Sequence, residues 1–272
     1  MIQPARAHPS SQVRSDRAQP DRAGRCIAVA SGKGGVGKTW FAITLAHAMA
    51  RNGLRVLLFD ADLGLANVDI QLGLMPALDL GSVVSGAATL SDAIAGFAPG
   101  GFDVMAGRSG SGSLAALDPK ALEGVLSALA LAAAHYDVVL LDLSAGVDPA
   151  VRRMAAWADT LLVVATEEPT SLTDAYATVK LHAADRPDGD ARLVVNLCST
   201  PAAGERTAAT LTRACHAFLG RTPPLLGTIR RDAHVQDAIR RQSLLLTRHP
   251  NCPASFDIEQ IAARIASDGL TA

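Results

Sequence analysis

Ser31-Gly32-Lys33-Gly34-Gly35-Val36-Gly37-Lys38-Thr39 is the stretch that decides how this chain folds. It follows the apolar run 26–30 and precedes the alanine-rich segment 40–50, which is the strand–loop–helix context of a phosphate-binding loop. Its glycines let successive N–H groups point inward at a helix start, where they cradle phosphate. Lys38 then reaches the β- and γ-phosphates, and the Thr39 hydroxyl ligates Mg²⁺. The sequence therefore predicts a nucleoside triphosphate site with Mg²⁺, whose loop contacts are Gly32, Lys33, Gly34, Gly35, Val36, Gly37, Lys38, Thr39 and Trp40.

Lys33, directly after the first glycine of the loop, gives the pattern K-G-G-x-G-K-T, the deviant form of the Walker A motif. With this pattern the sequence resembles the MinD/ParA family of dimeric ATPases. The resemblance implies that ATP is the nucleotide, that the ATP-bound state is a homodimer, and that Lys33 crosses to the partner's phosphates. A cation supplied in trans to developing charge can raise a rate by about 10³–10⁵. The alternative is that Lys33 is a solvated loop lysine.

Composition and length favour a single large domain for most of the chain. The 272 residues are 49% hydrophobic but only 4% aromatic, which predicts a core of Ala, Leu and Val. A net charge of −1 argues against binding a polyanion through bulk charge. The four cysteines have no C-x-x-C spacing, and therefore give no disulfide framework and no zinc or iron–sulfur spacing. Without a long apolar run or a signal core, the expected location is the cytoplasm.

Residues 1–24 differ in kind from the rest. Pro, Ser, Gln, Ala and Arg dominate them, which predicts a disordered basic tail that could dock a partner or be a solvated leader. Over 25–272, apolar runs alternate with helical patterns, as in βαβ units. Runs such as 138–141 and 161–164 are continuously apolar, as in strands covered on both faces. The body is therefore predicted to be one α/β domain with a doubly wound, mostly parallel sheet flanked by helices. The resemblance to the MinD/ParA family implies that this domain is of the SIMIBI-type P-loop NTPase class.

The strand and helix predictions follow from the positions of these runs. The expected strands are 26–30, 55–60, 102–105, 137–143, 160–166, 192–197 and 225–229. The expected helices are 38–51, 66–73, 89–95, 118–134, 148–157, 171–183, 204–219, 233–242 and 256–266. Thr170 and Ser171 suit the N-cap of the helix expected at 171–183.

Three carboxylates lie at or just after the carboxyl ends of predicted strands, at the edge of the sheet where α/β proteins place their ligands. Asp60 and Asp62 end the second strand, and Asp142 ends the apolar run 138–141 as a Walker B aspartate would. The resemblance implies that Asp62 orients the attacking water, while Thr39, Asp60 and Asp142 hold Mg²⁺. The predicted catalytic residues are then Lys33, Lys38 and Asp62. The alternative for Asp60 and Asp62 is an acidic turn that caps the next helix.

Two positions depart from the family pattern. Leu143 stands where relatives have the threonine of D-T-x-x-G, which removes a hydroxyl, and Trp40 stands where relatives have a small polar residue near the α-phosphate. The backbone N–H of Trp40 is retained. Both changes are compatible with nucleotide binding and favour slow, partner-stimulated hydrolysis.

Base recognition is predicted at two places. Asn196 ends the apolar run 193–195, and an amide can pair with a donor and an acceptor on an adenine edge. An asparagine that closes a strand is also a common turn former. The family's adenine loop reads G-x-I-P-x-D; here 227–232 is G-T-I-R-R-D, with Arg230 in place of proline and Asp232 at the end. Arg230 could stack on the purine or be solvated.

Three further phrases resemble the flagellar-number and placement ATPases of the FlhG/FleN (MinD-like) type. They are 60–69, D-A-D-L-G-L-A-N-V-D; 166–176, T-E-E-P-T-S-L-T-D-A-Y; and 239–242, I-R-R-Q. The resemblance implies an ATP-dependent switch that regulates flagellar number or placement and releases its partners on hydrolysis. The implied partners are a signal-recognition-type GTPase, C-ring components or a flagellar transcription activator, which could recruit the protein to the cell pole or membrane.

Other functions stay open. A ParA-type DNA partition ATPase would use an arginine patch, but a solvated helix face is the favoured interpretation of these residues: Arg221, Arg230, Arg231, Arg240, Arg241 and Arg248. A division-site ATPase of the MinD type and a weakly or non-hydrolysing ATP-binding scaffold are further alternatives. Direct membrane binding is expected to be weak or absent, because 256–266 has the pattern of a core-docking helix rather than a basic amphipathic one.

Overall fold

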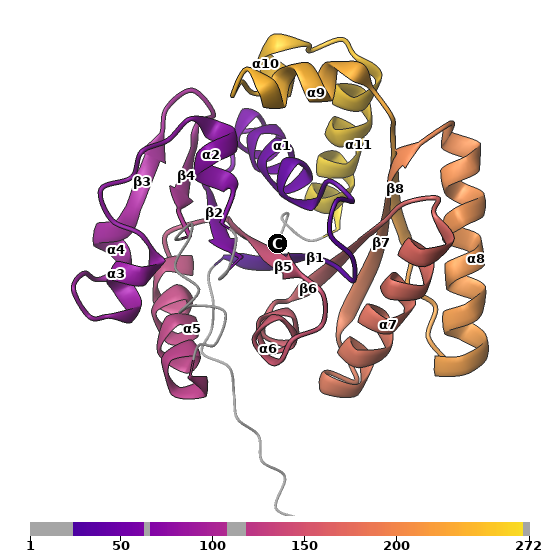
Figure 1. Ribbon diagram of the computed structural model, residues 1–272, viewed down its shortest axis with the longest axis horizontal. Coiled ribbons are helices and arrows are strands. Elements are labelled where there is room, and N and C mark those ends of the chain that lie inside the picture. The colour runs from indigo at the N-terminus through magenta and orange to yellow at the C-terminus, as the bar shows by residue number, and fades with distance from the viewer. Residues whose placement is uncertain (1–23, 63–65, 108–117, 269–272) are drawn as a thin grey trace, which may run out of the picture.

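The computed structural model describes residues 24–62, 66–107 and 118–268, so the predicted tail lies outside the described residues except for Gly24. Its strands are β1 (Arg25–Ser31), β2 (Val56–Ala61), β3 (Ile94–Phe97), β4 (Phe102–Met105), β5 (Val138–Ala145), β6 (Thr160–Ala165), β7 (Asp190–Cys198) and β8 (Leu225–Arg230). They form one sheet in the order β3-β4-β2-β5-β1-β6-β7-β8 (Figure 1). All neighbouring strands pair in parallel except β3 and β4, which are antiparallel. The predicted doubly wound, mostly parallel sheet is confirmed.

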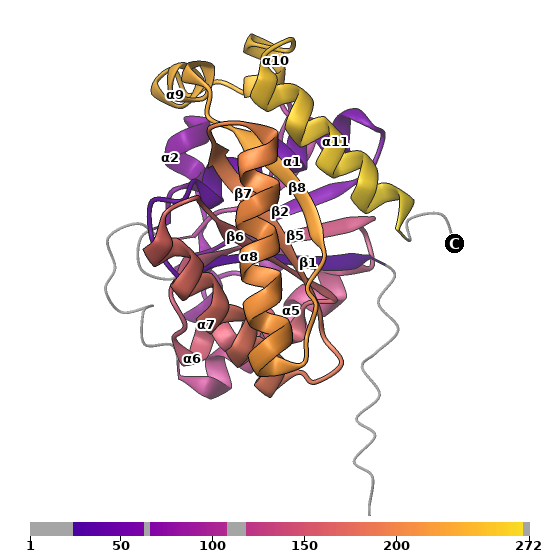
Figure 2. The same cartoon turned by 90° about the vertical axis from the view of Figure 1, so that its right-hand side faces the viewer.

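Helices cover both faces of this sheet (Figures 1 and 2). The upper face in Figure 1 carries α1 (Lys38–Arg51), α2 (Val68–Leu72), α9 (Ala233–Arg240), α10 (Leu245–Arg248) and α11 (Pro253–Ser267). The lower face carries α5 (Pro119–Ala133), α6 (Pro149–Trp157), α7 (Pro169–Asp185) and α8 (Pro201–Leu219). The two short helices α3 (Leu80–Val84) and α4 (Leu90–Ala93) pack near α5.

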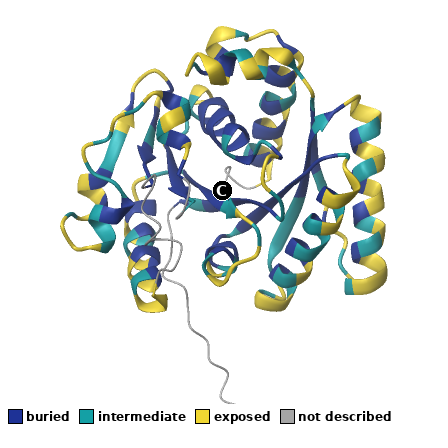
Figure 3. Ribbon diagram, in the orientation of Figure 1, coloured by how far each residue is buried: buried dark blue, intermediate teal, exposed yellow. Residues whose placement is uncertain are grey.

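The sheet separates two hydrophobic cores, and its central strands β1, β2, β5 and β6 are almost entirely buried (Figure 3). Alternate residues of a strand point to opposite faces. In β1, Ala28 and Ala30 therefore enter the lower core, whereas Ile27 and Val29 enter the upper one. Small alanines in the central strand let the helices approach the sheet closely, as the composition predicts.

The seven predicted strands are all present close to their expected bounds, and α1 has the bounds predicted for it. The helix signals are local and strong: α5, α6, α7, α8 and α11 each begin with a proline, whose missing N–H costs nothing in the first turn. The helix expected at 256–266 is α11, and it docks into the upper core through Ile258, Ile261 and Ile265. That interpretation of the C-terminal helix is confirmed. Within the described residues, no helix has both the length and the apolar character needed to span a bilayer.

The helix predicted at 89–95 is wrong over residues 94 and 95. A capping box between Thr89 and Asp92 begins α4, but the helix ends after Ala93 and the chain continues as the edge strand β3. Antiparallel pairing with β4 and contact of the Phe97 and Phe102 rings, whose centroids are 5.4 Å apart, hold this strand. Tertiary pairing overrides the local helical pattern here. The short helices α3 and α10 have no counterpart among the predicted elements.

His47 in α1 predicts how stability depends on pH. Its side chain is buried, and its Nδ1 has no hydrogen-bond partner among the described residues. Burial, and after it the charge of Arg51, lowers the pKa of His47 from 6.5 to about 4. The unfolded chain takes up this proton near pH 6.5, so falling pH favours unfolding until the native pKa is reached. We expect His47 to reduce stability by about 2 kcal/mol between pH 7 and pH 5.

Urea unfolding of the wild type and of His47→Leu at both pH values checks this expectation. The variant should lack the part of the pH dependence of stability that is due to His47. The other titrating groups are the same in both proteins, so their contributions cancel when the two are compared. A variant whose stability falls as steeply with pH as that of the wild type would contradict the assignment to His47.

Candidate nucleotide-binding site

The phosphate-binding loop lies at the carboxyl ends of the parallel strands, between β1 and α1 (Figure 1). Gly37, the residue before α1, has a φ of 84°, a left-handed conformation that other residues seldom adopt. A Cβ atom on Gly37 would also lie 2.5 Å from Nδ2 of Asn196. At Gly32, a Cβ atom would lie 2.3 Å from the carbonyl oxygen of Asp174 in α7. The loop therefore fits against β7 and α7 only with glycine at these two positions.

Asn196 lies beneath the loop and supports it. Its Nδ2 donates to the carbonyl oxygen of Val36 at 2.8 Å, and its Oδ1 accepts from the N–H of Leu197 at 2.8 Å. The side chain is fully buried. This support of the phosphate loop has no counterpart in the sequence predictions, and recognition of adenine by Asn196 stays a prediction.

Lys38 begins α1 and is paired with a buried carboxylate. Its Nζ lies 3.0 Å from Oδ1 of Asp142, and the two side chains are 8% and 1% exposed. The Thr39 side chain also hydrogen-bonds Asp142. Burial raises the pKa of Asp142, while the charge of Lys38 and the Thr39 hydrogen bond oppose that rise. The structure therefore brings together Lys38, predicted to bind phosphate, with Thr39 and Asp142, predicted to bind Mg²⁺.

Asp60 lies beside Asp142, because β2 and β5 pair in register at these two residues. It is fully buried and accepts three backbone N–H groups, each at 3.1 Å, from Asp62, Asn67 and Val68. Burial, followed by the charge of Asp142, raises the pKa of Asp60 to about 7. Oxygen donors of this kind suit Mg²⁺, and a divalent charge between the carboxylates would offset their repulsion. Thr39, Asp60 and Asp142 thus fit the metal they are predicted to bind.

Asp62 contacts a hydroxyl group that has no predicted role. The Ser144 hydroxyl donates to Oδ1 of Asp62 at 3.0 Å. Successive side chains of a strand alternate between its faces, so the preceding Leu143 points the other way and is fully buried in the lower core. The hydroxyl beside Asp62 therefore comes from Ser144 rather than from position 143. Residues 63–65, within the phrase 60–69, lie outside the described residues.

Lys33 is held within its own chain. Its Nζ lies 2.7 Å from Oε2 of Glu168 and 3.1 Å from the Thr170 hydroxyl. This contact lowers the pKa of Glu168. The N-cap of α7 is Glu168, with Pro169 as the first helical residue, so Thr170 and Ser171 are inside the helix and their predicted capping role is wrong. The crossing of Lys33 to a partner subunit stays a prediction.

The Trp40 side chain is 6% exposed and belongs to the upper core together with Val36 of the loop. Because Trp40 follows Thr39 directly, we expect Mg-ATP to change its fluorescence. The chain has 2 tryptophans, so titration of a Trp157→Phe protein reports Trp40 alone. A silent titration in a sample that calorimetry shows to bind Mg-ATP would contradict this placement of Trp40.

Arg230 and Asp232, predicted to contact the base, are anchored to C-terminal helices. Nη2 of Arg230 lies 2.7 Å from Oδ1 of Asp257 in α11, and its Nε lies 2.9 Å from Oδ2. Asp232 is the N-cap of α9 and accepts from the N–H groups of His234, at 2.9 Å, and Ala254, at 3.2 Å. These contacts fix the loop after β8, and binding of adenine by it stays a prediction.

Half of the predicted arginine patch is paired with aspartates: Arg230 with Asp257, and Arg241 and Arg248 with Asp237. Arg221 donates to the carbonyl oxygen of Pro187. A guanidinium neutralised by a carboxylate contributes less to phosphate binding than a free one. The geometry of these side chains therefore gives no support to the DNA-binding alternative.

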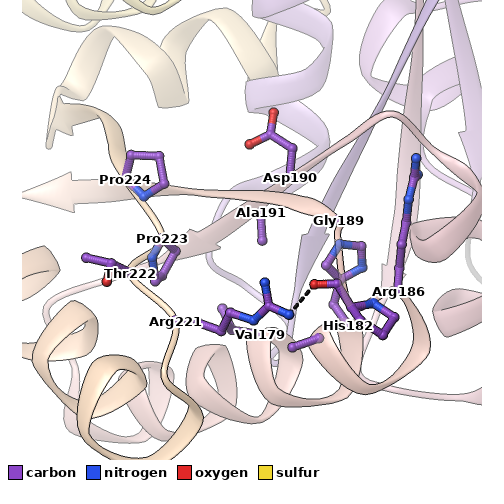
Figure 4. Close-up of a pocket in the computed structure, with 12 residues that line it drawn as sticks. Val179, His182, Arg186, Gly189, Asp190, Ala191, Arg221, Thr222, Pro223 and Pro224 are labelled. Atoms are coloured by element: carbon purple, nitrogen blue, oxygen red, sulfur yellow. Dashed lines mark hydrogen bonds between the residues drawn. The ribbon is translucent and has the colours of Figure 1, made fainter.

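A cavity of 190 Å³ lies at the amino end of β7, which is the opposite end of that strand from Asn196 (Figure 4). The buried His182 lines it, and neither ring nitrogen has a hydrogen-bond partner among the described residues. Arg221 crosses toward Pro187 on the same wall. The cavity is thus separate from the phosphate-binding loop and contains none of the predicted site residues.

Comparisons with known proteins identify a nucleotide-binding family. The chain matches the model of the CobQ/CobB/MinD/ParA nucleotide binding domain over residues 27–245. It is 37% identical over 246 residues to the antiactivator FleN of Pseudomonas aeruginosa, covering 90% of this chain and 88% of the relative. It is 29% identical over 250 residues to the flagellum site-determining protein YlxH of Helicobacter pylori, covering 89% and 81%.

Solved structures of low identity share the fold. The septum site-determining protein MinD of Pyrococcus horikoshii, complexed with Mg-ADP, aligns with a TM-score of 0.77 at 23% identity, covering 92% of this chain and 99% of that one. The cell division ATPase MinD of Pyrococcus furiosus gives 0.77 at 24% identity, covering 90% and 100%. The P-loop NTPase fold and the resemblance to MinD-like proteins of the FleN type are thereby confirmed. With its loop, its buried lysine–aspartate contact and a family match over most of its length, the chain belongs to the CobQ/CobB/MinD/ParA family of nucleotide-binding proteins.

Proposed function

We propose that the protein is an ATP-dependent, dimerising switch that hydrolyses ATP to ADP and phosphate and regulates the number or placement of flagella. The single observation that carries the proposal is the convergence of Lys38, Thr39, Asp60 and Asp142 at the phosphate-binding loop. The flagellar part is supported by the likeness to FleN and to YlxH, the second of which is described as flagellum site-determining.

Each side chain has a distinct task in the proposed reaction. Thr39, Asp60 and Asp142 would hold Mg²⁺, which would supply charge neutralisation to the phosphates of ATP. Lys38 exchanges its contact with Asp142 for the phosphates of ATP. Asp62 orients the attacking water, and the Ser144 hydrogen bond fixes the carboxylate for that task.

Asp62→Ala tests whether the site hydrolyses ATP. Removing the water-orienting carboxylate should lower the turnover of ATP by about 100-fold or more. The affinity for Mg-ATP should stay close to that of the wild type, because Asp62 is not assigned to the phosphates or the metal. Phosphate release and isothermal titration calorimetry measure the two effects.

Asp188→Ala removes an exposed carboxylate from the turn after α7 and is the matched control, expected to hydrolyse ATP at the wild-type rate. Equal turnover in wild-type and Asp62→Ala protein would instead favour the alternative of a non-hydrolysing scaffold.

In the proposed cycle, ATP closes two subunits face to face, and the dimer binds flagellar assembly proteins in the cytoplasm or at the pole. The candidate partners are a signal-recognition-type GTPase, C-ring components and a transcription activator. A pull-down from cell extract with Asp62→Ala in Mg-ATP, compared with the binding-deficient Lys38→Ala, should retain such a protein only in the first case. Retention of DNA in place of a flagellar protein would favour a partition ATPase.

A further inference from the structure

A second group of chemically reactive side chains lies where the chain leaving β8 meets the first turns of α9 and α11. Asp232, His234 and Cys252 place a carboxylate oxygen, an imidazole nitrogen and a thiol sulfur within 4.8 Å of one another. Asp232 and Cys252 are the N-caps of α9 and α11, and His234 is the second residue of α9. We propose that these three side chains form a binding site for a divalent transition metal ion of the Zn²⁺ type.

The donor set selects the class of metal. Zn²⁺ binds thiolate, imidazole and carboxylate together, usually in a tetrahedron, whereas Mg²⁺ and Ca²⁺ prefer shells made of oxygen. Three protein ligands leave the fourth position of a tetrahedron for water. The site therefore differs in chemistry from the one formed by Thr39, Asp60 and Asp142, which offers oxygen atoms alone.

The present contacts show where the ion would sit. Nδ1 of His234 lies 2.8 Å from Oδ1 of Asp232, and the Cys252 thiol also hydrogen-bonds Asp232. A metal ion would take the place of the protons in these two contacts. The thiol proton would be released to solvent, and the neutral imidazole would carry its proton on Nε2. A helix N-cap needs only one oxygen acceptor, so capping accounts for Asp232 but not for an imidazole and a thiol on the same carboxylate.

Each of the three ligands is oriented by a neighbour, as metal ligands generally are. The His249 ring packs on that of His234 with centroids 4.4 Å apart, and Nε2 of His249 lies 2.9 Å from Oδ2 of Asp237. The Cys252 sulfur lies 3.3 Å from the Ser255 hydroxyl. The backbone N–H groups of residues 234 and 254 hold Asp232.

The three ligands differ in their exposure to solvent, which gives the site both shielding and an entry path. The side chains of Asp232 and His234 are 7% and 52% exposed, and Cys252 is 6% exposed. An ion can therefore approach from solvent past His234, while the carboxylate and the thiol are protected within the fold. The site shares no residue with the phosphate-binding loop, although Asp232 also belongs to the loop after β8 that is predicted to contact adenine. Metal binding is therefore measured without nucleotide.

Cobalt titration of the full-length, metal-free and nucleotide-free protein tests the proposal, since Co²⁺ reports zinc sites by its spectrum. We expect one Co²⁺ per chain with a thiolate-to-cobalt charge-transfer band and visible bands of tetrahedral intensity, both abolished by Zn²⁺. Cys252→Ala should remove the charge-transfer band. His234→Ala should weaken cobalt binding by at least about tenfold, since the loss of even an outer-shell partner costs that much.

Matched controls are Cys215→Ala, a buried cysteine in α8, and His135→Ala, an exposed histidine after α5; both should bind Co²⁺ as the wild type does. His234 is exposed, so its variant keeps the test valid even if Cys252→Ala fails to fold, as circular dichroism would show. The absence of a charge-transfer band in the wild type, or undiminished cobalt affinity in His234→Ala, would overturn the proposal. Neither result would bear on Mg-ATP binding, which is measured separately.

Discussion

Replacing Lys38 with alanine is expected to abolish useful nucleotide binding, with the affinity for Mg-ATP reduced by about 100-fold or more. In the proposed role Lys38 donates charge-assisted hydrogen bonds to two phosphates. The other lysine of the loop is Lys33, which is paired with Glu168. The same change leaves Asp142 buried beside Asp60 without its cation. Stability should therefore fall by about 3 kcal/mol, as when one partner of a buried ion pair is removed.

Calorimetric titration with Mg-ATP measures the first effect and urea unfolding the second. Lys180→Ala, which removes an exposed lysine from α7, is the matched control and should change neither quantity. Near-wild-type affinity in a folded Lys38→Ala protein would show that the phosphates bind elsewhere.

Replacing Lys33 with alanine is expected to spare most of the nucleotide affinity and to weaken ATP-dependent dimerisation by about 100-fold or more, as loss of one partner of an interfacial charge pair does. In the single chain Lys33 contacts Glu168 and Thr170, and the lysine and glutamate side chains are 39% and 63% exposed. An exposed ion pair is worth at most about 1 kcal/mol. Lys33 can therefore leave Glu168 at little cost when a partner's phosphates are present.

Analytical sedimentation in Mg-ATP measures the strength of dimerisation. The Lys33 variant is made in the Asp62→Ala background, which is expected to hydrolyse ATP slowly. Glu168→Ala is the informative companion, because it removes the contact within the chain while keeping Lys33; it should dimerise at least as well as the background protein. Dimerisation of Lys33→Ala at the strength of its background would contradict the role of Lys33 in trans.

The strand order along the chain could be predicted because each βαβ unit is a local pattern of apolar runs, glycines and helix-starting prolines. The edge strand β3 could not, because its four residues have no pattern of their own and are held by pairing with β4. Similarly, the short helices α3 and α10 are too brief for a periodic signal.

The same distinction between local and distant contacts applies to the candidate site. Loop glycines, Lys38 and Thr39 are adjacent in sequence, so their task follows from the motif alone. Asn196 and Glu168 contact the loop from residues more than a hundred positions away, and only the fold reveals those contacts. The alternation along β5 decides that Ser144, and not residue 143, faces Asp62.

The sequence by itself therefore determined the phosphate-binding loop, the parallel sheet and the carboxylates at its edge, since each is encoded within a few neighbouring residues. Tertiary structure alone decided which distant side chains contact one another. Asp60 lies beside Asp142 through the strand register, and Glu168 forms an ion pair with Lys33. Asp232, His234 and Cys252 come together where the chain after β8 contacts α11. The physical reason is that hydrogen bonds, ion pairs and metal ligation depend on distances in space. Sequence spacing determines such distances only within a single turn, strand or helix.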